Sequence, residues 1–310
     1  MKSSKKQTAS PKPRIGMIGL GIMGGIMAET LRQHGYAVCG FDIDAKAKAR
    51  LKKAGGSALA SVGDVVKNAD VLMTSLSTSQ ALSQVTKEIA LCAKQHKAHA
   101  KVLIETSTLP MLDKESCAAQ LKSAGITTLD CPISGTAVRL KDRAWTIFAS
   151  GPKTAYQKVL PILQVFTDNT PYVGPYGSGS KMKFAANHLV AIYNVAYAES
   201  VTLARKMGLD PREMLKLFGD SPVLGTGVMR LRMAMMLERE YSPPTMKVQV
   251  WQKDMEVIGE MAKSVDCPTP LFTASASIYT AAMAQGLAMQ DTASTAEVLG
   301  AMAGIKPKAF

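Results

Sequence analysis

Short blocks of apolar residues alternate with amphipathic segments through the first half of the chain. Blocks bounded by turn residues predict buried strands, at 14–18, 36–42, 69–74, 101–105, 126–130 and 144–150. Apolar residues at helical spacing between them predict helices, at about 23–35, 45–53, 61–67, 79–92 and 110–123. Strands separated by helices of this length predict a doubly wound, mostly parallel α/β sheet.

The second half of the chain shows helical spacing only. Gly174, Gly177 and Gly179 precede a run without Pro or Gly that reaches Gly208. This run predicts one helix over about 179–207, which at 1.5 Å per residue is roughly 40 Å long. The further predicted helices are 212–218, 225–240, 246–263, 270–284 and 292–299.

Three regions follow from these patterns. We expect a disordered basic tail at 1–12, the α/β domain at 13–175 and an all-helical domain at 176–310. The long helix would join the two domains. The helical domain is small and rich in Ala and Met, so we also expect a partner copy to cover it, as a homodimer or homotetramer.

The long helix carries an unusual polar stripe. Lys183, Asn187 and Asn194 lie within about 40° of one another at ~100° per residue. The other positions predict a helix that is buried on most sides. These apolar positions are Met182, Ala185, Ala186, Leu189, Val190, Ile192, Tyr193, Ala196 and Leu203. A lysine and two amides on such a helix indicate a functional surface, although we expect Asn194 to face another helix of the second domain.

A glycine motif directly follows the first predicted strand and opens the first predicted helix. Gly19 allows a tight turn, Gly21 lets the backbone approach a pyrophosphate, and Gly24 lets the helix pack closely. An anion there would lie on the free N–H groups of the helix N-terminus. We therefore predict a Rossmann-type dinucleotide site, whose turn consists of Gly19, Leu20, Gly21, Ile22, Met23 and Gly24.

Asp42 ends the second predicted strand, where an acidic residue binds the ribose hydroxyls in such sites. Its charge would repel a 2′-phosphate, which favours NAD over NADP. Lys46 and Lys48 lie close by and could tolerate that phosphate, so NADP stays possible. Asp44 is instead expected to cap the helix that follows.

The carboxyl ends of parallel strands line the ligand crevice of a doubly wound sheet. We therefore expect segments 75–77, 106–108 and 130–136 to converge on one cleft. In the last of these segments, Ser134, Gly135 and Thr136 could hold a carboxylate with a hydroxyl and backbone N–H groups. Taken alone, this tripeptide is better explained as an ordinary turn.

Composition narrows the protein class. The chain has 310 residues, of which 47% are hydrophobic and 20% charged, as expected of a globular protein with two domains. No apolar run is long enough for a membrane span, and the polar N-terminus has no signal-like apolar segment. The five cysteines lack a CxxC pair, and His96 and His99 stand without carboxylates, so we expect a reduced cytoplasmic protein and no metal site.

The formal net charge of +13 also fits a nucleic-acid-binding protein. The basic residues are spread along the chain and are not interleaved with aromatic residues. A basic surface that attracts an anionic substrate and cofactor explains the charge better. A cofactor-binding nucleic-acid or chromatin adaptor is the non-enzymatic alternative, and strongly salt-dependent DNA binding without turnover would favour it.

Four motifs in sequence order resemble the β-hydroxyacid dehydrogenases, the group related to 3-hydroxyisobutyrate dehydrogenase. They are Gly19-x-Gly21-x-Met23-Gly24, Asp130-x-Pro132-x-Ser134-Gly135, Gly174-x-x-Gly177-x-Gly179-x-x-x-Lys183-x-x-x-Asn187 and Lys253-Asp254. The match runs over about residues 14–300. Four motifs at compatible spacings are much more specific than one.

The resemblance implies a Rossmann domain followed by an all-helical domain. It implies Lys183 as the catalytic residue and Asn187 with the Ser134–Gly135 turn as substrate-binding residues. It also implies that Leu76, Ser77 and Thr108 face the nicotinamide and that Lys253 contacts the cofactor.

The chain departs from the family pattern at Thr136 and Arg143, where glycines are usual, and at Ser77, where proline is common. These changes concern the substrate more than the chemistry. One hypothesis is that Arg139, Lys141 or Arg143 reaches a second anionic or polyhydroxy group of the substrate; a solvated basic loop is the simpler explanation.

The sequence thus predicts an NAD(H)-linked enzyme for a small 3-hydroxyacid or its semialdehyde. It would be of the 2-hydroxy-3-oxopropionate reductase or 3-hydroxyisobutyrate dehydrogenase type. Alternatives in the same family are an NADP-preferring semialdehyde or glyoxylate reductase and a threonate-type sugar-acid dehydrogenase. A 6-phosphogluconate dehydrogenase would need a longer helical domain, and imine reductases usually lack the lysine.

Overall fold

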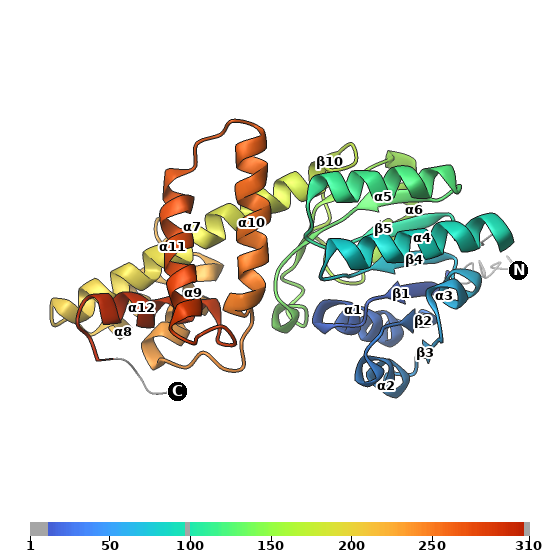
Figure 1. The fold of residues 1–310 in the computed structure, drawn as a ribbon. Helices are drawn as coiled ribbons and strands as arrows, with labels where there is room; N and C mark the ends of the chain where they lie inside the picture. Colours follow the sequence, from blue (N-terminus) through green and yellow to red (C-terminus); the bar gives the residue numbers. More distant parts are fainter. Residues whose placement is uncertain (1–11, 97–99, 307–310) are drawn as a thin grey trace, which may run out of the picture. The chain divides into compact units, whose positions relative to one another are not determined.

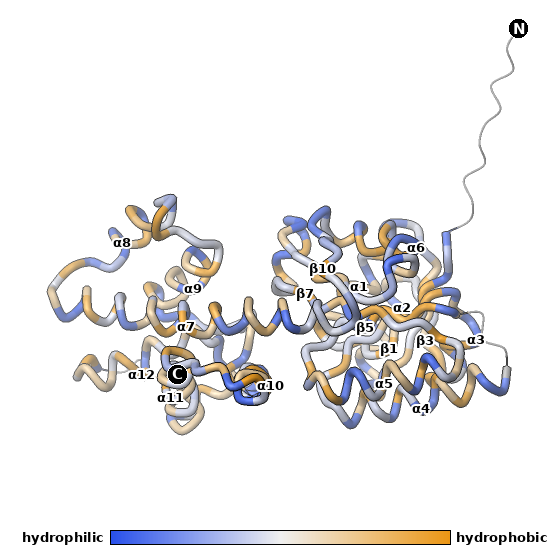
Figure 2. Tube along the Cα trace, turned by 90° about the horizontal axis from the view of Figure 1, so that it is seen from above, coloured by the Kyte–Doolittle hydropathy of each residue, from blue (hydrophilic) through white to orange (hydrophobic). Residues whose placement is uncertain are grey.

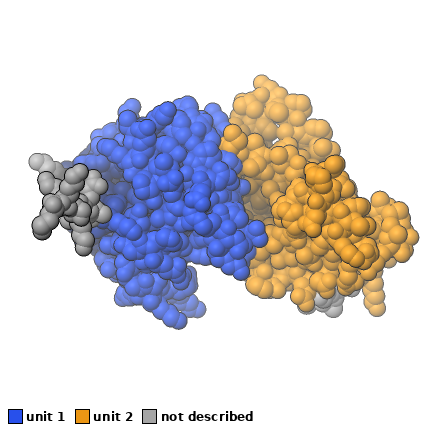
Figure 3. Space-filling view, turned by 180° about the vertical axis from the view of Figure 1, so that it is seen from behind, with its two compact units in different colours: residues 1–181 blue, residues 182–310 orange. Residues whose placement is uncertain are grey.

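A computed structural model describes residues 12–96 and 100–306, so the predicted tail, apart from Lys12, and His99 lie outside the described residues. The chain forms two compact units, Met1–Lys181 and Met182–Phe310 (Figure 3). Each unit has its own hydrophobic core, as the two predicted domains require.

The first unit is built on an eight-stranded sheet in the order β10-β9-β6-β5-β4-β1-β2-β3 (Figure 1). The strands β1 to β6 are parallel to one another, whereas β9 runs antiparallel to β6. This arrangement confirms the predicted doubly wound, mostly parallel sheet. The strands are β1 Ile15–Ile18, β2 Val38–Phe41, β3 Ser57–Ala58, β4 Val71–Thr74, β5 Val102–Glu105, β6 Thr127–Asp130, β9 Ala149–Ser150 and β10 Tyr172–Gly174.

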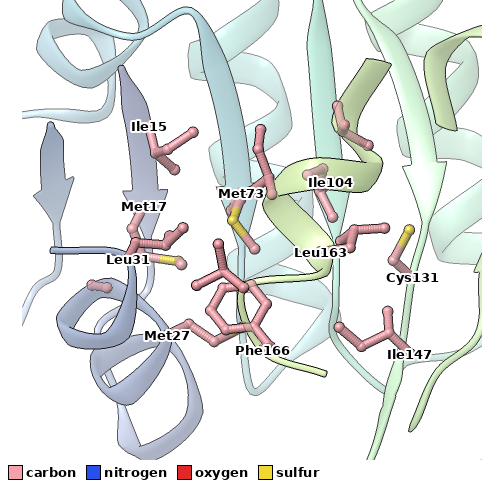
Figure 4. Packing of buried hydrophobic residues seen from close by; sticks show 14 of the residues in the cluster. Ile15, Met17, Met27, Leu31, Met73, Ile104, Cys131, Ile147, Leu163 and Phe166 are labelled. Carbon is pink, nitrogen blue, oxygen red and sulfur yellow. The ribbon is translucent and has the colours of Figure 1, made fainter. Parts of the chain in front are cut away.

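Helices cover both faces of this sheet. Successive residues of a strand point to opposite faces, and both sets are apolar here, so each face packs against helices. Met73 and Ile104 belong to a core with α1, α2 and α6, whereas their neighbours Leu72 and Leu103 belong to a core with α3, α4 and α5. Met27 and Phe166 fill the first of these cores (Figure 4). The helices are α1 Ile22–Gln33, α2 Ala45–Lys53, α3 Val62–Asn68, α4 Ser79–His96, α5 Met111–Ser123 and α6 Lys153–Leu163.

The predicted single strand at 144–150 was wrong, because this segment divides between two sheets. Thr146–Ile147 (β8) pairs with Ile133–Ser134 (β7) in a separate two-stranded sheet, whereas Ala149–Ser150 (β9) joins the main sheet. The Phe148 N–H between them donates to Pro132 O at 3.1 Å. Helix α6 and the short strands β3, β7 and β10 are not predicted by the sequence pattern.

The described part of the second unit is helical apart from an isolated β-bridge between Lys247 and Asp291. The buried ion pair Arg232–Asp291 and the partly buried pair Arg239–Glu297 connect its segments. None of the described helices is long and apolar enough to cross a membrane, and Figure 2 shows helices such as α4 alternating between hydrophilic and hydrophobic residues. The remaining helices are α7 Ser178–Lys206, α8 Pro211–Phe218, α9 Gly227–Glu238, α10 Val248–Ser264, α11 Pro270–Ala284, η1 Ala137–Arg139 (in the first unit), η2 Thr292–Ser294 and α12 Thr295–Met302.

Helix α7 confirms the predicted long helix but corrects the expectation that it is buried on most sides. Met182, Leu189, Tyr193 and Leu203 are 46%, 47%, 38% and 58% exposed. They lie within about 80° of one another at ~100° per residue, so they form one exposed apolar stripe. We call these four residues the α7 apolar stripe.

The polar stripe of α7 is buried. Asn194 donates to Thr292 O at 2.8 Å and to the Tyr279 hydroxyl at 3.2 Å. The expectation that Asn194 faces other elements of the helical domain is therefore confirmed. Its amide holds η2 and α11 against α7.

Candidate active site

The Gly19–Gly24 turn connects β1 to α1 and needs glycine for two different reasons. A Cβ at Gly19, whose φ is +87°, would lie 2.2 Å from Ser75 O, and a Cβ at Gly24 would lie 2.0 Å from Gly19 O. At Gly21, by contrast, a Cβ would meet no atom within 4 Å. The fold itself therefore requires Gly19 and Gly24, whereas Gly21 leaves open space in front of the turn.

This open space lies at the N-terminus of α1. Gly21 is the N-cap residue of α1 and supplies no side-chain hydrogen bond to the first turn. The first N–H groups of a helix without such a cap can donate to an anion, and the helix dipole favours it. The turn thus fits the pyrophosphate of a dinucleotide.

Asp42 follows β2 and is fixed beside the glycine turn. Its Oδ2 accepts a hydrogen bond from the Leu20 N–H at 2.6 Å, and its Oδ1 accepts one from the Asp44 N–H at 2.7 Å. The carboxylate is partly exposed, so it can also accept from the hydroxyls of a ribose. Asp44 accepts from the Lys46 and Ala47 N–H groups and caps α2, as predicted.

The ends of β4 and β5 lie side by side, because these strands pair in register. The Leu76 N–H donates to Ser107 Oγ at 2.8 Å, which ties the two segments that follow the strands. Leu76 and Thr108 are half-buried and Ser77 is exposed. Segments 75–77 and 106–108 thus converge at the carboxyl edge of the sheet.

The turn at Ser134–Thr136 is held by Trp145. The indole N–H of Trp145 donates to Thr136 O at 2.7 Å, and a Cβ at Gly135, whose φ is +146°, would lie 2.4 Å from the Trp145 ring. Gly135 is therefore required by the buried indole beside it. Ser134 and Thr136 are half-buried and Gly135 is exposed, so the turn faces solvent with a fixed backbone.

The basic loop that follows uses one of its arginines within the first unit. Arg143 donates to Gln164 O and Val165 O and pairs with Asp168 at 2.8 Å. Its φ of +53° explains why glycine suits this position better. These contacts argue against Arg143 as a substrate ligand. Lys141 is exposed and makes none of them.

A second group of polar residues lies on α7 and α10 in the second unit. Lys183 and Asn187 are buried on one face of α7, 8% and 4% exposed. The Asn187 amide donates to Asp254 Oδ2 at 2.9 Å, and Lys253 Nζ lies 3.3 Å from Asp254 Oδ1. Asp254 therefore fixes the amide orientation, so that the Asn187 oxygen points away from the carboxylate.

The buried position of Lys183 changes its chemistry. Burial lowers the pKa of Lys183 from its ordinary 10.5 to about 8; Asp254 opposes this shift and Lys253 adds to it. An amine with a pKa near 8 is present in both protonation states near neutral pH. It can therefore give or take a proton, as a general acid or base does.

Two features of these groups are not predicted from the sequence. Asp254 was noted only as part of a Lys-Asp pair, although Trp251 and Ile258 place it on the buried face of α10. Lys114, on α5, is completely buried between Glu105 and Asp130. The signal for Lys114 was its helical spacing with the buried Cys117 and Leu121.

In the described residues no group of three His, Cys, Asp or Glu side chains could hold a metal ion.

Two family models together match most of the chain. The NAD binding domain of 6-phosphogluconate dehydrogenase matches residues 14–174, and the NAD-binding domain of NADP-dependent 3-hydroxyisobutyrate dehydrogenase matches residues 177–299. The two matches meet near the first turn of α7.

Individual proteins are similar over nearly the whole chain. An NAD-dependent L-serine dehydrogenase of Pseudomonas aeruginosa is 30% identical over 90% of this chain and 95% of its own length. A chloroplastic glyoxylate/succinic semialdehyde reductase of Arabidopsis thaliana is 26% identical over 96% of this chain and 84% of its own.

A solved structure supports the fold. It is a Mycobacterium tuberculosis 3-hydroxyisobutyrate dehydrogenase with L-serine, with a TM-score of 0.82 at 22% identity over 93% of this chain and 99% of its own. The glycine turn and the matching models on both halves of the chain lead to one assignment. The chain belongs to the 3-hydroxyisobutyrate dehydrogenase-like β-hydroxyacid dehydrogenase family, whose members are NAD(P)-dependent oxidoreductases acting on the CH–OH group of 3-hydroxyacids.

Proposed function

We propose that this enzyme interconverts a small 3-hydroxyacid and its semialdehyde with NAD(H), and that Lys183 is the general acid/base. The observation that carries this proposal is the buried Lys183 with its pKa lowered to about 8. A lysine on a surface would be almost fully protonated at neutral pH.

In the direction of oxidation, the neutral Lys183 amine would accept the proton of the substrate hydroxyl. In reduction, the protonated amine would return it to the oxygen. Asn187, whose Nδ2 is bound to Asp254, would present its oxygen to the substrate hydroxyl. Ser134, Gly135 and Thr136 would hold the substrate carboxylate through a hydroxyl and backbone N–H groups.

The glycine turn would bind the dinucleotide, which accepts or donates the hydride when bound. Gly19, Leu20, Gly21, Ile22, Met23 and Gly24 would hold its pyrophosphate, as the open space at Gly21 suggests. Leu76, Ser77 and Thr108 would face the nicotinamide from the strand ends, and Lys253 would contact the cofactor from the helical domain. Asp42 supports NAD over NADP, because a second negative charge on the ribose would meet its carboxylate.

Several substrates fit this chemistry. The similarity to an L-serine dehydrogenase and to a glyoxylate/succinic semialdehyde reductase supports acids of two to four carbons. A threonate-type sugar acid or an NADP-linked semialdehyde reductase is the alternative within the family. Lys141 is exposed in the basic loop and could favour a substrate with a second anionic group. Equal kcat/KM values for a plain and a doubly acidic substrate would contradict this role of Lys141.

We further propose a homodimer or homotetramer. The α7 apolar stripe exposes four large side chains, and such a stripe is expected to be covered by another copy.

The five cysteines are free, which supports a reducing compartment such as the cytoplasm. Nucleic acid is not an expected partner.

A substrate panel tests the proposed function. Purified enzyme is assayed with 3-hydroxyisobutyrate, L-serine, glycerate, threonate and short semialdehydes, each with NAD(H) and NADP(H). We expect turnover of at least one acid–semialdehyde pair and a higher kcat/KM with NAD(H). No turnover of any member of the panel, together with salt-dependent DNA binding, would refute the proposal and favour the non-enzymatic alternative.

A further inference from the structure

A completely buried lysine lies at the carboxyl edge of the sheet. Nζ of Lys114 is 2.5 Å from Glu105 Oε2 and 2.6 Å from Asp130 Oδ1. It also donates to Ser107 O at 2.8 Å and to Ser180 Oγ at 2.9 Å. Four polar partners surround an ammonium group that is not accessible to solvent.

The buried charges of this cluster carry a desolvation cost. Burial lowers the pKa of Lys114, but the attraction of Glu105 and Asp130 outweighs it, so the pKa rises above its ordinary value and the lysine stays charged. Buried ion pairs of this kind are often no more stable than well-packed apolar residues. A cluster with such a desolvation cost calls for another role, and its connections suggest one.

On one side the cluster fixes a strand end. Ser107 gives its carbonyl to Lys114, accepts the Leu76 N–H through Oγ and donates its own N–H to Glu105 Oε1 at 2.8 Å. Ser107 belongs to one of the two segments proposed to face the nicotinamide, directly before Thr108, and binds Leu76 of the other. Its backbone and side chain are therefore held from three directions.

On the other side the cluster fixes the first turn of α7. The Ser180 N–H and hydroxyl both donate to Asp130, each at 2.8 Å, and the Gly179 N–H donates to Ser150 Oγ at 2.9 Å. A Cβ at Gly179 would lie 2.3 Å from Phe148 O, so only glycine permits this close approach. The free N–H groups of the helix start are thus bound by buried side chains of the sheet.

We propose that Lys114 is a positioning residue that ties the first turn of α7 to the strand end at Ser107. This inference rests on the proposed function, because Lys183 follows Ser180 by three residues on the same helix. Lys114 touches neither substrate nor cofactor in this role. It sets where α7 starts relative to the edge at which the nicotinamide is proposed to lie.

Two variants of the full-length enzyme test the proposal. Ser180→Ala removes the hydroxyl that binds both Lys114 and Asp130 and keeps the hydrogen bond from the Ser180 N–H to Asp130. Lys114→Met combined with Glu105→Gln removes the lysine but keeps the formal charge of the cluster at −1, because one positive and one negative charge are lost together. The control is Ser200→Ala, an exposed serine of the same helix.

Four quantities are measured: kcat, the Kd for NADH, the melting temperature, and hydrogen exchange of peptides along the chain, among them the one that covers the first turn of α7. We expect both test variants to lower kcat by about tenfold to hundredfold, as a small misplacement of reacting groups does. The Kd for NADH should change by less than about threefold, in contrast to kcat, because the glycine turn is untouched. Exchange should accelerate in the first turn of α7 only, and Ser200→Ala should match the wild type.

Two results would overturn the positioning role. One is unchanged kcat together with unchanged hydrogen exchange in Ser180→Ala; the other is a lower melting temperature as the only effect of both variants. A wild-type enzyme without turnover on the substrate panel would instead refute the proposed function. In that case, exchange limited to the first turn of α7 would still support the tie to Ser107, and unchanged exchange would overturn it.

Discussion

Hydroxyacid oxidation should follow the titration of Lys183. Burial places the pKa of Lys183 at about 8, against an ordinary 10.5. At 1.36 kcal/mol per unit, this difference favours the neutral amine by about 3 kcal/mol. About one molecule in ten would then carry the neutral amine at pH 7, against about one in three thousand for an unperturbed lysine.

The direction of the reaction sets the sign of the pH dependence. Oxidation needs the neutral amine, so its kcat/KM should rise with pH and level off above about 8. Reduction needs the protonated amine, so its kcat/KM should fall through the same pH. The assay is the initial rate of NADH formation or consumption between pH 6 and 10, at saturating cofactor and limiting substrate.

Asp254→Asn provides the perturbation. An asparagine can still accept the hydrogen bond from Asn187, but the charge that raises the pKa of Lys183 is lost. The inflection of the oxidation profile should therefore move to lower pH. Glu256→Gln, an exposed site two residues further along α10, is the matched control and should leave the profile unchanged. An inflection that stays in place in Asp254→Asn, or moves to higher pH, would refute this account of Lys183.

Three other predictions test separate parts of the structure. Gly21→Ala should leave the melting temperature of the free enzyme unchanged but weaken NADH binding by at least about tenfold. Gly24→Ala should also destabilise the fold, because its Cβ would lie 2.0 Å from a backbone oxygen. Equal melting temperatures for the two variants would contradict this. Lys183→Met should raise the free energy of unfolding at pH 7 by about 1 to 3 kcal/mol. The reason is that a buried amine with a lowered pKa costs stability below about pH 8, and this stability is regained as the pH rises toward 10.5. A lower free energy of unfolding for Lys183→Met in urea at pH 7 would contradict this. Leu203→Lys, in the α7 apolar stripe, should reduce the mass of the assembly in light scattering, whereas the exposed Glu199→Ala should not; an unchanged mass for Leu203→Lys would exclude this surface as the interface.

The sheet and the cofactor turn could be predicted from the sequence because their signals are local. Strand, glycine turn, helix and Asp42 follow one another within a few tens of residues, and each has its own reason for its residue type. The long helix was predicted for the same reason, from a run that contains neither Pro nor Gly. Its exposed stripe was not, because an apolar residue on a helix has the same pattern whether the chain itself or a second copy covers it.

The Lys114 cluster could not be predicted because its partners are distant in sequence. Lys114 meets Ser180 across 66 residues and Asp130 across 16. Each of these residues alone is typical of a surface or a turn. The prediction of a single strand over 144–150 was wrong for a related reason. The pairing of this segment with Ile133–Ser134 depends on a turn that Trp145 fixes through a tertiary contact.

The most direct measurement of the central claim compares Lys183→Ala with Lys181→Ala. Lys181 lies two residues away on α7 and is exposed, so it matches the charge change without the buried site. Both variants and the wild type are assayed for kcat on the best substrate of the panel and for NADH binding. We predict that Lys183→Ala loses at least about a hundredfold in kcat and keeps its NADH affinity, whereas Lys181→Ala retains both. Turnover of Lys183→Ala close to that of the wild type would contradict the assignment of Lys183 as the acid/base.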